Sequence, residues 1–120
     1  MKFALLVYEN DEELDCRTDP QDKDYWPSYG LYSQSLTEAG IMVGGNALRE
    51  PGLATTVRRV DQNDVVADGP FIDTKEKLGG LFVIEVDSLD DALVWAKKCP
   101  SVTRGRGSVE IRPILEMNGP

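Results

Sequence analysis

Two predicted helices, each lying between strand-like segments, constrain the fold of this chain most. The first carries an apolar stripe at spacings of three and four residues, made by Tyr25, Tyr29, Tyr32, Leu36 and Ala39. That spacing is typical of an amphipathic helix, and Gly40 is expected to end it. In the second, Ser88 and Asp91 have the spacing of a capping box, and Pro100 is expected to stop the helix.

The segments around these helices are rich in apolar and β-branched residues and predict strands. They span residues 3–8, 41–48, 54–60, 65–67, 81–86 and 109–114, with a hairpin turn at 61–64. Two strand–helix units that frame an antiparallel hairpin indicate an α+β fold. We therefore expect a single domain over residues 1–120, a ferredoxin-like sandwich with an antiparallel sheet and two helices on one face.

The second face of such a sheet has no helix to cover it. The strands at 3–8 and 81–86 are apolar at both parities, so this face should also carry apolar side chains. A second copy of the same sheet would cover it most simply. The sequence therefore predicts a homodimer.

The net charge and the cysteines restrict which partners and which cellular compartment we expect for this chain. The formal net charge of −8 argues against nucleic-acid binding, which needs cationic side chains to neutralise phosphates. Most of the acidity lies in residues 9–24, which we expect to form a solvated loop. Cys16 and Cys99 belong to no metal-spaced set and predict free thiols, hence a cytoplasmic protein. No segment approaches the roughly 20 apolar residues of a membrane span.

Charges of the last strand are candidates for ligand binding. Val109 and Ile111 share one parity, and Glu110 and Arg112 share the other. If the apolar side faces the helices, Glu110 and Arg112 face the dimer interior, where Arg58 could join them. Arg58 and Arg112 would then hold a small anion. The alternative is a structural arginine–glutamate pair at the subunit interface.

The stretch 68–80, DGPFIDTKEKLGG, holds the other charged candidates. Gly69-Pro70 predicts a stiff, extended turn, because a residue before proline is excluded from the helical region. Asp68 or Glu110 is the candidate proton carrier, and Asp73 a candidate ligand contact. The alternative is structural, with Asp73 capping a turn.

Trp26 and Tyr29 lie in or near the first helix and are candidate pocket walls. An aromatic helical stripe is more often core, but a buried phenol hydroxyl or indole N–H needs a hydrogen-bond partner. The chain has no histidine, which excludes a histidine-based triad or zinc site. Only carboxylates remain as metal ligands, so we expect no metal and no cofactor.

The stretch VADGPFIDTKEKLGG is similar to the signature of the DGPF family, which belongs to the YCII-related proteins. The resemblance extends to ATTVR, to the strand at 81–86, to SLDDALVWAKKCP and to VEIRPILEM. It implies a dimeric α+β barrel. The wider superfamily includes enzymes similar to muconolactone isomerase and chloromuconolactone dehalogenase, which act on small anionic lactones.

This chain differs from some members of the family that it resembles at their catalytic site. Those relatives pair a histidine on the first helix with an aspartate as a catalytic dyad. Here Ser28 stands near the histidine position and Glu38 near the acid position, so the dyad cannot be assembled. Asp73 stands where the family usually has glutamate.

Two functions follow as hypotheses. In the first, the protein binds or transforms a small anionic molecule in a pocket near the DGPF turn. In the second, it is a non-catalytic dimeric module that regulates or binds a protein, because genes of the DGPF family often lie beside alternative sigma factors. The second predicts an exposed patch, for example around residues 11–24, and no convergent polar pocket.

Overall fold

The computed structural model of the chain describes residues 1–117 as six strands and five short or medium helical segments. In chain order they are β1 (Lys2–Asn10), α1 (Asp11–Asp15), α2 (Tyr25–Glu38), β2 (Met42–Ala47), the 3₁₀ turn η1 (Pro51–Leu53), β3 (Thr55–Val60), β4 (Asn63–Asp68), β5 (Glu76–Glu85), α3 (Leu89–Ala96), α4 (Pro100–Thr103) and β6 (Gly107–Pro113).

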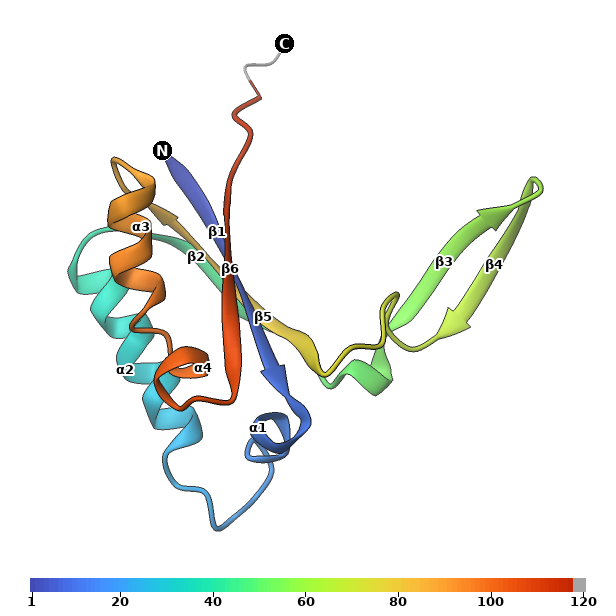
Figure 1. The fold of residues 1–120 in the computed structure, drawn as a ribbon, viewed down its shortest axis with the longest axis horizontal. Helices are drawn as coiled ribbons and strands as arrows, with labels where there is room; N and C mark the ends of the chain where they lie inside the picture. The colour runs from blue at the N-terminus through green and yellow to red at the C-terminus, as the bar shows by residue number, and fades with distance from the viewer. Residues whose placement is uncertain (118–120) are drawn as a thin grey trace.

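Four strands form one antiparallel sheet in the order β2-β5-β1-β6. Figure 1 shows α2 and α3 together on one side of this sheet. The predicted α+β, ferredoxin-like arrangement is therefore confirmed. Two of the predicted signals mark helix ends, because Gly40 follows α2 with a φ of 74° and the Ser88 side chain accepts a hydrogen bond from the Asp91 N–H. Pro100 does not stop the second helix as predicted, because α3 already ends at Ala96 and Pro100 begins α4.

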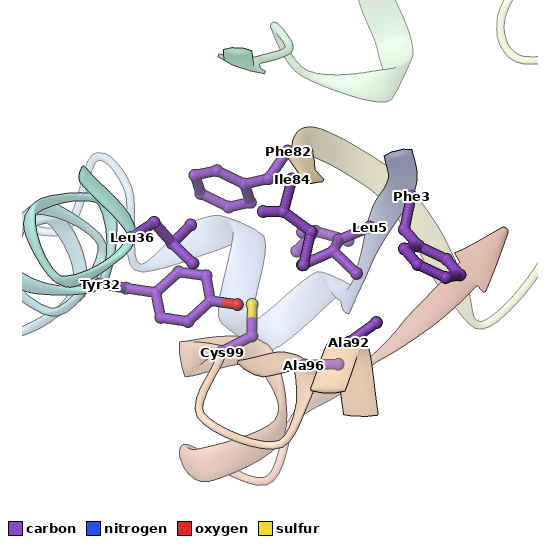
Figure 2. Packing of buried hydrophobic residues seen from close by; sticks show 10 residues of the cluster. Phe3, Leu5, Tyr32, Leu36, Phe82, Ile84, Ala92, Ala96 and Cys99 are labelled. Atoms are coloured by element: carbon purple, nitrogen blue, oxygen red, sulfur yellow. The ribbon is translucent and has the colours of Figure 1, made fainter. Parts of the chain in front are cut away.

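The core lies between the sheet and the helices. Alternate residues of β1 point toward the helices and are buried, and they pack with side chains of the neighbouring strand β5 and of α2 and α3 (Figure 2). The buried core cluster consists of Phe3, Leu5, Val7, Tyr32, Leu36, Phe82, Ile84, Ala92, Ala96 and Cys99. The Tyr32 hydroxyl, which points into the core, donates a hydrogen bond to the Trp95 carbonyl oxygen at 2.8 Å. On β6, Val109 and Ile111 pack against this core, as their parity predicted.

The acidic stretch is not the solvated loop that its composition predicted. Asn10 caps the short helix α1, accepting from the Glu13 N–H at 2.9 Å, and both Glu9 and Glu13 are buried. Arg104, just after α4, makes a two-pronged ion pair with Glu13, with its Nε 2.8 Å from Oε2. The prediction is wrong for Glu9 and Glu13 because arginines compensate their charges, Arg17 of the same stretch for Glu9 and the distant Arg104 for Glu13.

The β3–β4 hairpin forms a sheet of its own and joins none of the other strands. Its two turn residues, Asp61 and Gln62, have positive φ values of 49° and 69°, which matches the twist of a tight hairpin. We call residues 55–68 the arm. The arm stands away from the body, on the side of the sheet opposite to α2 and α3 (Figure 1).

No helix within residues 1–117 combines the length and apolar character needed to cross a membrane.

Candidate functional site

A cavity of about 320 Å³ lies between the first half of α2 and the sheet. Its walls come from the helix at Trp26, Tyr29 and Gly30, and from the neighbouring strands β2 and β5. Most of the wall is apolar, and its volume lies at the lower end of the range for small-molecule sites. The polar groups gather at one end, where β1 finishes.

Glu9 is the centre of that polar end. It continues the inward-facing alternation of Phe3, Leu5 and Val7, so the pleat of β1 places its carboxylate inside, with no exposed surface. Its Oε1 accepts a hydrogen bond from the Tyr25 hydroxyl at 2.7 Å, and its Oε2 accepts one from the Tyr29 hydroxyl at 3.1 Å. A carboxylate buried in this way must be paired and hydrogen-bonded.

Arg17 supplies the compensating charge. Its Nη2 lies 3.5 Å from Glu9 Oε1, and its Nε donates to the Tyr25 hydroxyl oxygen at 2.8 Å. The guanidinium also donates to the carbonyls of Leu48 at 2.6 Å and Gly79 at 2.9 Å. These contacts occupy most of its five N–H groups, so Arg17 is a fixed positive charge with little capacity left for a ligand.

A β-bulge at Gly79 makes room for the Arg17 guanidinium. The register between β1 and β5 shifts between Val7 and Tyr8, which leaves Gly79 opposite neither residue. A Cβ at Gly79 would lie 3.1 Å from both Arg17 Nη2 and Glu9 Oε1. Glycine at this position lets the backbone carbonyl approach the guanidinium while leaving room for the carboxylate.

Both tyrosines are held in their protonated form. Burial is the main cause that raises the pKa of Tyr25 and of Tyr29 well above the usual range, and the neighbouring carboxylate of Glu9 adds to it. Each hydroxyl therefore stays a hydrogen-bond donor to Glu9. Because the Tyr29 proton points to Glu9, its oxygen is free to accept a hydrogen bond from a molecule in the cavity.

The residues singled out in the sequence fall in three places. Trp26 and Tyr29 line the cavity, and the Trp26 indole N–H donates to the Arg17 carbonyl at 3.0 Å. The structure does not bring the other five to it. Arg58, Asp68 and Asp73 are exposed in or beside the arm, while Glu110 and Arg112 pair at 2.6 Å on the sheet face away from the helices. The predicted arginine–glutamate pair at a subunit interface stays a prediction.

The DGPF turn lines a different feature. A groove of about 580 Å³ lies where the arm leaves the sheet, and Pro70 and Phe71 form part of its wall. Gly69 has a φ of 101°, a backbone conformation open to glycine, and its carbonyl accepts a hydrogen bond from the Thr56 hydroxyl at 2.9 Å. Arg58 lies over the Phe71 ring, 5.9 Å from its centroid.

Sequence reasoning missed Glu9 and Arg17 as site residues. A signal for Glu9 was present, because its parity continues that of Phe3, Leu5 and Val7 and so places it on the helix side of the sheet. No local pattern marks Arg17, whose partners lie as far as 62 positions away at Gly79. Within residues 1–117, no three cysteine or carboxylate side chains are grouped to hold a metal ion.

Comparison with known proteins gives a consistent family and fold. An uncharacterized protein, R00369 of Rhizobium meliloti (strain 1021), is 30% identical over 114 residues, which cover 95% of this chain and 92% of that protein. Among solved structures, the chain is similar to 5-chloro-2-hydroxyhydroquinone dehydrochlorinase (TftG) from Burkholderia phenoliruptrix AC1100, in complex with 2,5-dihydroxybenzoquinone. That likeness has a TM-score of 0.58 at 15% identity, covers 98% of this chain and 96% of the enzyme, and concerns the fold alone. Residues 1–118 match the YCII-related domain, and the chain therefore belongs to the YCII-related family.

Proposed function

We propose that this protein binds a small, mainly apolar molecule in the cavity beside α2, with the Tyr29 hydroxyl contacting its polar group and Glu9 holding that hydroxyl from behind. The observation that carries the proposal is a fully buried carboxylate at the polar end of an apolar cavity. Burying Glu9 costs free energy that the core does not require, since an apolar side chain would complete the β1 pattern. Buried charge at a cavity is typical of functional sites.

The contacts favour a ligand with a hydroxyl group over a carboxylate. Arg17 is already bound to two carbonyls, Tyr25 and Glu9, so it has little capacity to hold an anion. The free acceptor is the Tyr29 oxygen, because the Glu9 carboxylate has no exposed surface. A hydroxylated ring fits both the apolar wall and this acceptor, and the ligand named for the dehydrochlorinase is of this class.

The same geometry supports proton transfer. A bound phenol or enol would donate its proton to the Tyr29 oxygen while the Tyr29 proton moves to Glu9 Oε2, across a hydrogen bond of 3.1 Å. The ligand keeps the electron pair of its O–H bond and becomes the anion, next to the fixed charge of Arg17. The predicted binding of a small anion by Arg58 and Arg112 concerns a different place, because both side chains lie on the other side of the sheet. It stays a prediction.

A ligand panel tests the proposal. We expect 2,5-dihydroxybenzoquinone or another hydroxylated six-membered ring to raise the melting temperature, because a ligand at 100 times its Kd stabilises by about 2.7 kcal/mol. Tyr29→Phe should weaken binding roughly fivefold through loss of one hydrogen bond worth about 1 kcal/mol. The control is Tyr8→Phe, on the opposite face of the sheet. Equal binding by the two variants, or no binding by any ring of the panel, would contradict the proposal.

We also propose that the protein is a homodimer in the cytoplasm. The sheet face away from the helices carries half-buried apolar side chains, including Leu6, Tyr8 and Val83, which no helix covers. Cys16 and Cys99 are buried free thiols, as is usual in a reducing compartment. Light scattering coupled to size exclusion would give the mass of the particle directly.

The alternative function, a dimeric regulatory or protein-binding module, predicted no convergent polar pocket. The cavity at Glu9 favours the small-molecule function over it, because four polar side chains from three separate segments meet there. A binding role for the exposed carboxylates of residues 11–24 stays a prediction.

A further inference from the structure

Gly30 is a residue of α2 that the fold itself does not explain. It lies inside the helix, well away from both the start at Tyr25 and the end at Glu38. A glycine inside a helix lowers the equilibrium constant for helix formation about fivefold relative to alanine, because its backbone loses more entropy on ordering. The chain therefore gives up stability at this position.

The two usual structural reasons for a glycine do not hold at position 30. Its φ does not lie in the left-handed region, unlike that of Gly40. A Cβ at Gly30 would meet no other part of the chain within 4 Å, whereas a Cβ at Gly80 would lie 2.8 Å from the Asn46 carbonyl oxygen. Neither the backbone conformation nor the packing of the chain requires glycine at position 30.

Gly30 borders the cavity where the cavity opens. Trp26, Gly30 and Ser33 all line it, and their spacing of four and three residues puts them on one stripe of α2. On the opposite wall, Gly45 and Asn46 belong to β2, which is an edge strand of the sheet. Gly30, Gly45 and Asn46 are exposed to solvent. We call this opening the mouth, formed by Gly30, Ser33, Gly45 and Asn46.

The cavity is larger than a bare ring needs. An apolar cavity of about 150 Å³ holds benzene in another protein. The cavity here measures about 320 Å³, so a ring bound through its hydroxyl at Tyr29 leaves room for a substituent. The wall is mostly apolar outside the polar end, which favours an apolar substituent.

We propose that Gly30 determines which ring substituents the cavity accepts. The inference rests on the proposed small-molecule function and deepens it, because it names the ligand class as a phenol with an apolar substituent opposite its hydroxyl. Tyr29 holds the hydroxyl of the ligand, and the substituent extends toward the mouth and lies against the helix backbone at Gly30. Glycine permits this close approach because it has no Cβ.

A pair of phenols tests this assignment. 4-Propylphenol has two methylene groups more than 4-methylphenol, and each buried methylene group contributes a factor of about four in affinity. We expect wild type to bind 4-propylphenol roughly tenfold more tightly, measured by isothermal titration calorimetry. Gly30→Leu should fill the space at the mouth, so that the two Kd values become nearly equal. Gln34→Leu is the matched control and should keep the preference, because it adds the same side chain to an exposed position of α2 outside the cavity wall.

Gly30→Ala provides a second variant in case leucine disturbs the helix. Without ligand, its melting temperature should rise by about 4 °C, because alanine favours the helix and its methyl group meets no other part of the chain. Its preference for 4-propylphenol should fall about fourfold, which corresponds to the displacement of one methylene group. A more stable protein with weaker selectivity is not expected of a glycine with a purely structural role. A lower melting temperature would overturn the inference, since position 30 would then not be open.

The outcomes separate this inference from the proposed function. If Gly30→Leu keeps the preference for 4-propylphenol, or if wild type shows none, the role of Gly30 is overturned while the small-molecule function stands. Wild type that binds 2,5-dihydroxybenzoquinone but neither phenol contradicts the ligand class alone. Wild type that binds no ring at all overturns both proposals.

Discussion

Residues 9–24 and residues 68–76 are both rich in acidic side chains, yet the structure uses them in opposite ways. In the first stretch Glu9 and Glu13 are fully buried. In the second, Asp68 and Asp73 are exposed, and neither takes part in an ion pair among residues 1–117. An acidic stretch thus contributes buried carboxylates in one place and a solvated surface in the other.

The difference lies in arginines that pair with the buried carboxylates, one from a distant segment and one from within the stretch itself. Arg104 is 91 positions from Glu13, and it reaches both Glu13 and Asp22. Arg17 does the same for Glu9 at the cavity. Because the stability of a buried carboxylate depends on its partner, removing the cation should matter far more in the first stretch than removing a carboxylate in the second.

The largest effect is expected for Arg104→Ala. This change leaves the buried carboxylate of Glu13 without its partner, which typically costs 3–5 kcal/mol of unfolding free energy, measured here by urea denaturation. Arg59→Ala is the control. Arg59 holds Asp64 at 2.9 Å, close to the 2.8 Å of the Arg104–Glu13 pair, but on the exposed arm, so its loss should cost less than about 1 kcal/mol. Similar losses of unfolding free energy in the two variants would show that burial of the carboxylate does not decide the cost of losing its arginine.

A pH-dependent effect is expected from Asp22. Hydrogen bonds from the backbone N–H groups of Tyr25 and Asp24 hold the pKa of its carboxyl well below the usual range, and Arg104 also donates to it. A lowered folded-state pKa stabilises the protein above the unfolded value near 4, and this contribution is lost as pH falls toward the folded value. Wild type should therefore lose stability below about pH 4, relative to Asp22→Asn. A stability difference that stays constant from pH 6 to pH 2 would contradict the assignment.

The fold was predictable because its signals are local. The stripe on α2, the cap at Ser88 and the parity of β6 each depend on neighbouring residues, and each matches the structure apart from Ala39, which follows α2 and is exposed. The cavity was only partly predictable. Tyr29 follows from the helical stripe and Trp26 from its place at the start of the helix, whereas Arg17 reaches Glu9 only through the bulge at Gly79 and the turn after α1, which no local pattern specifies.

The smallest effect is expected in the second stretch. Asp68→Asn and Asp73→Asn remove charges that are solvated and outside every ion pair of the described chain, so each should change the unfolding free energy by less than about 0.5 kcal/mol. The DGPF turn would then depend on its backbone, since Gly69 has a φ that other residues adopt with strain. Urea denaturation of the two variants beside wild type measures the difference. A loss above about 1 kcal/mol for either aspartate would show that its carboxylate has a partner in the assembled protein, and the second acidic stretch would then resemble the first.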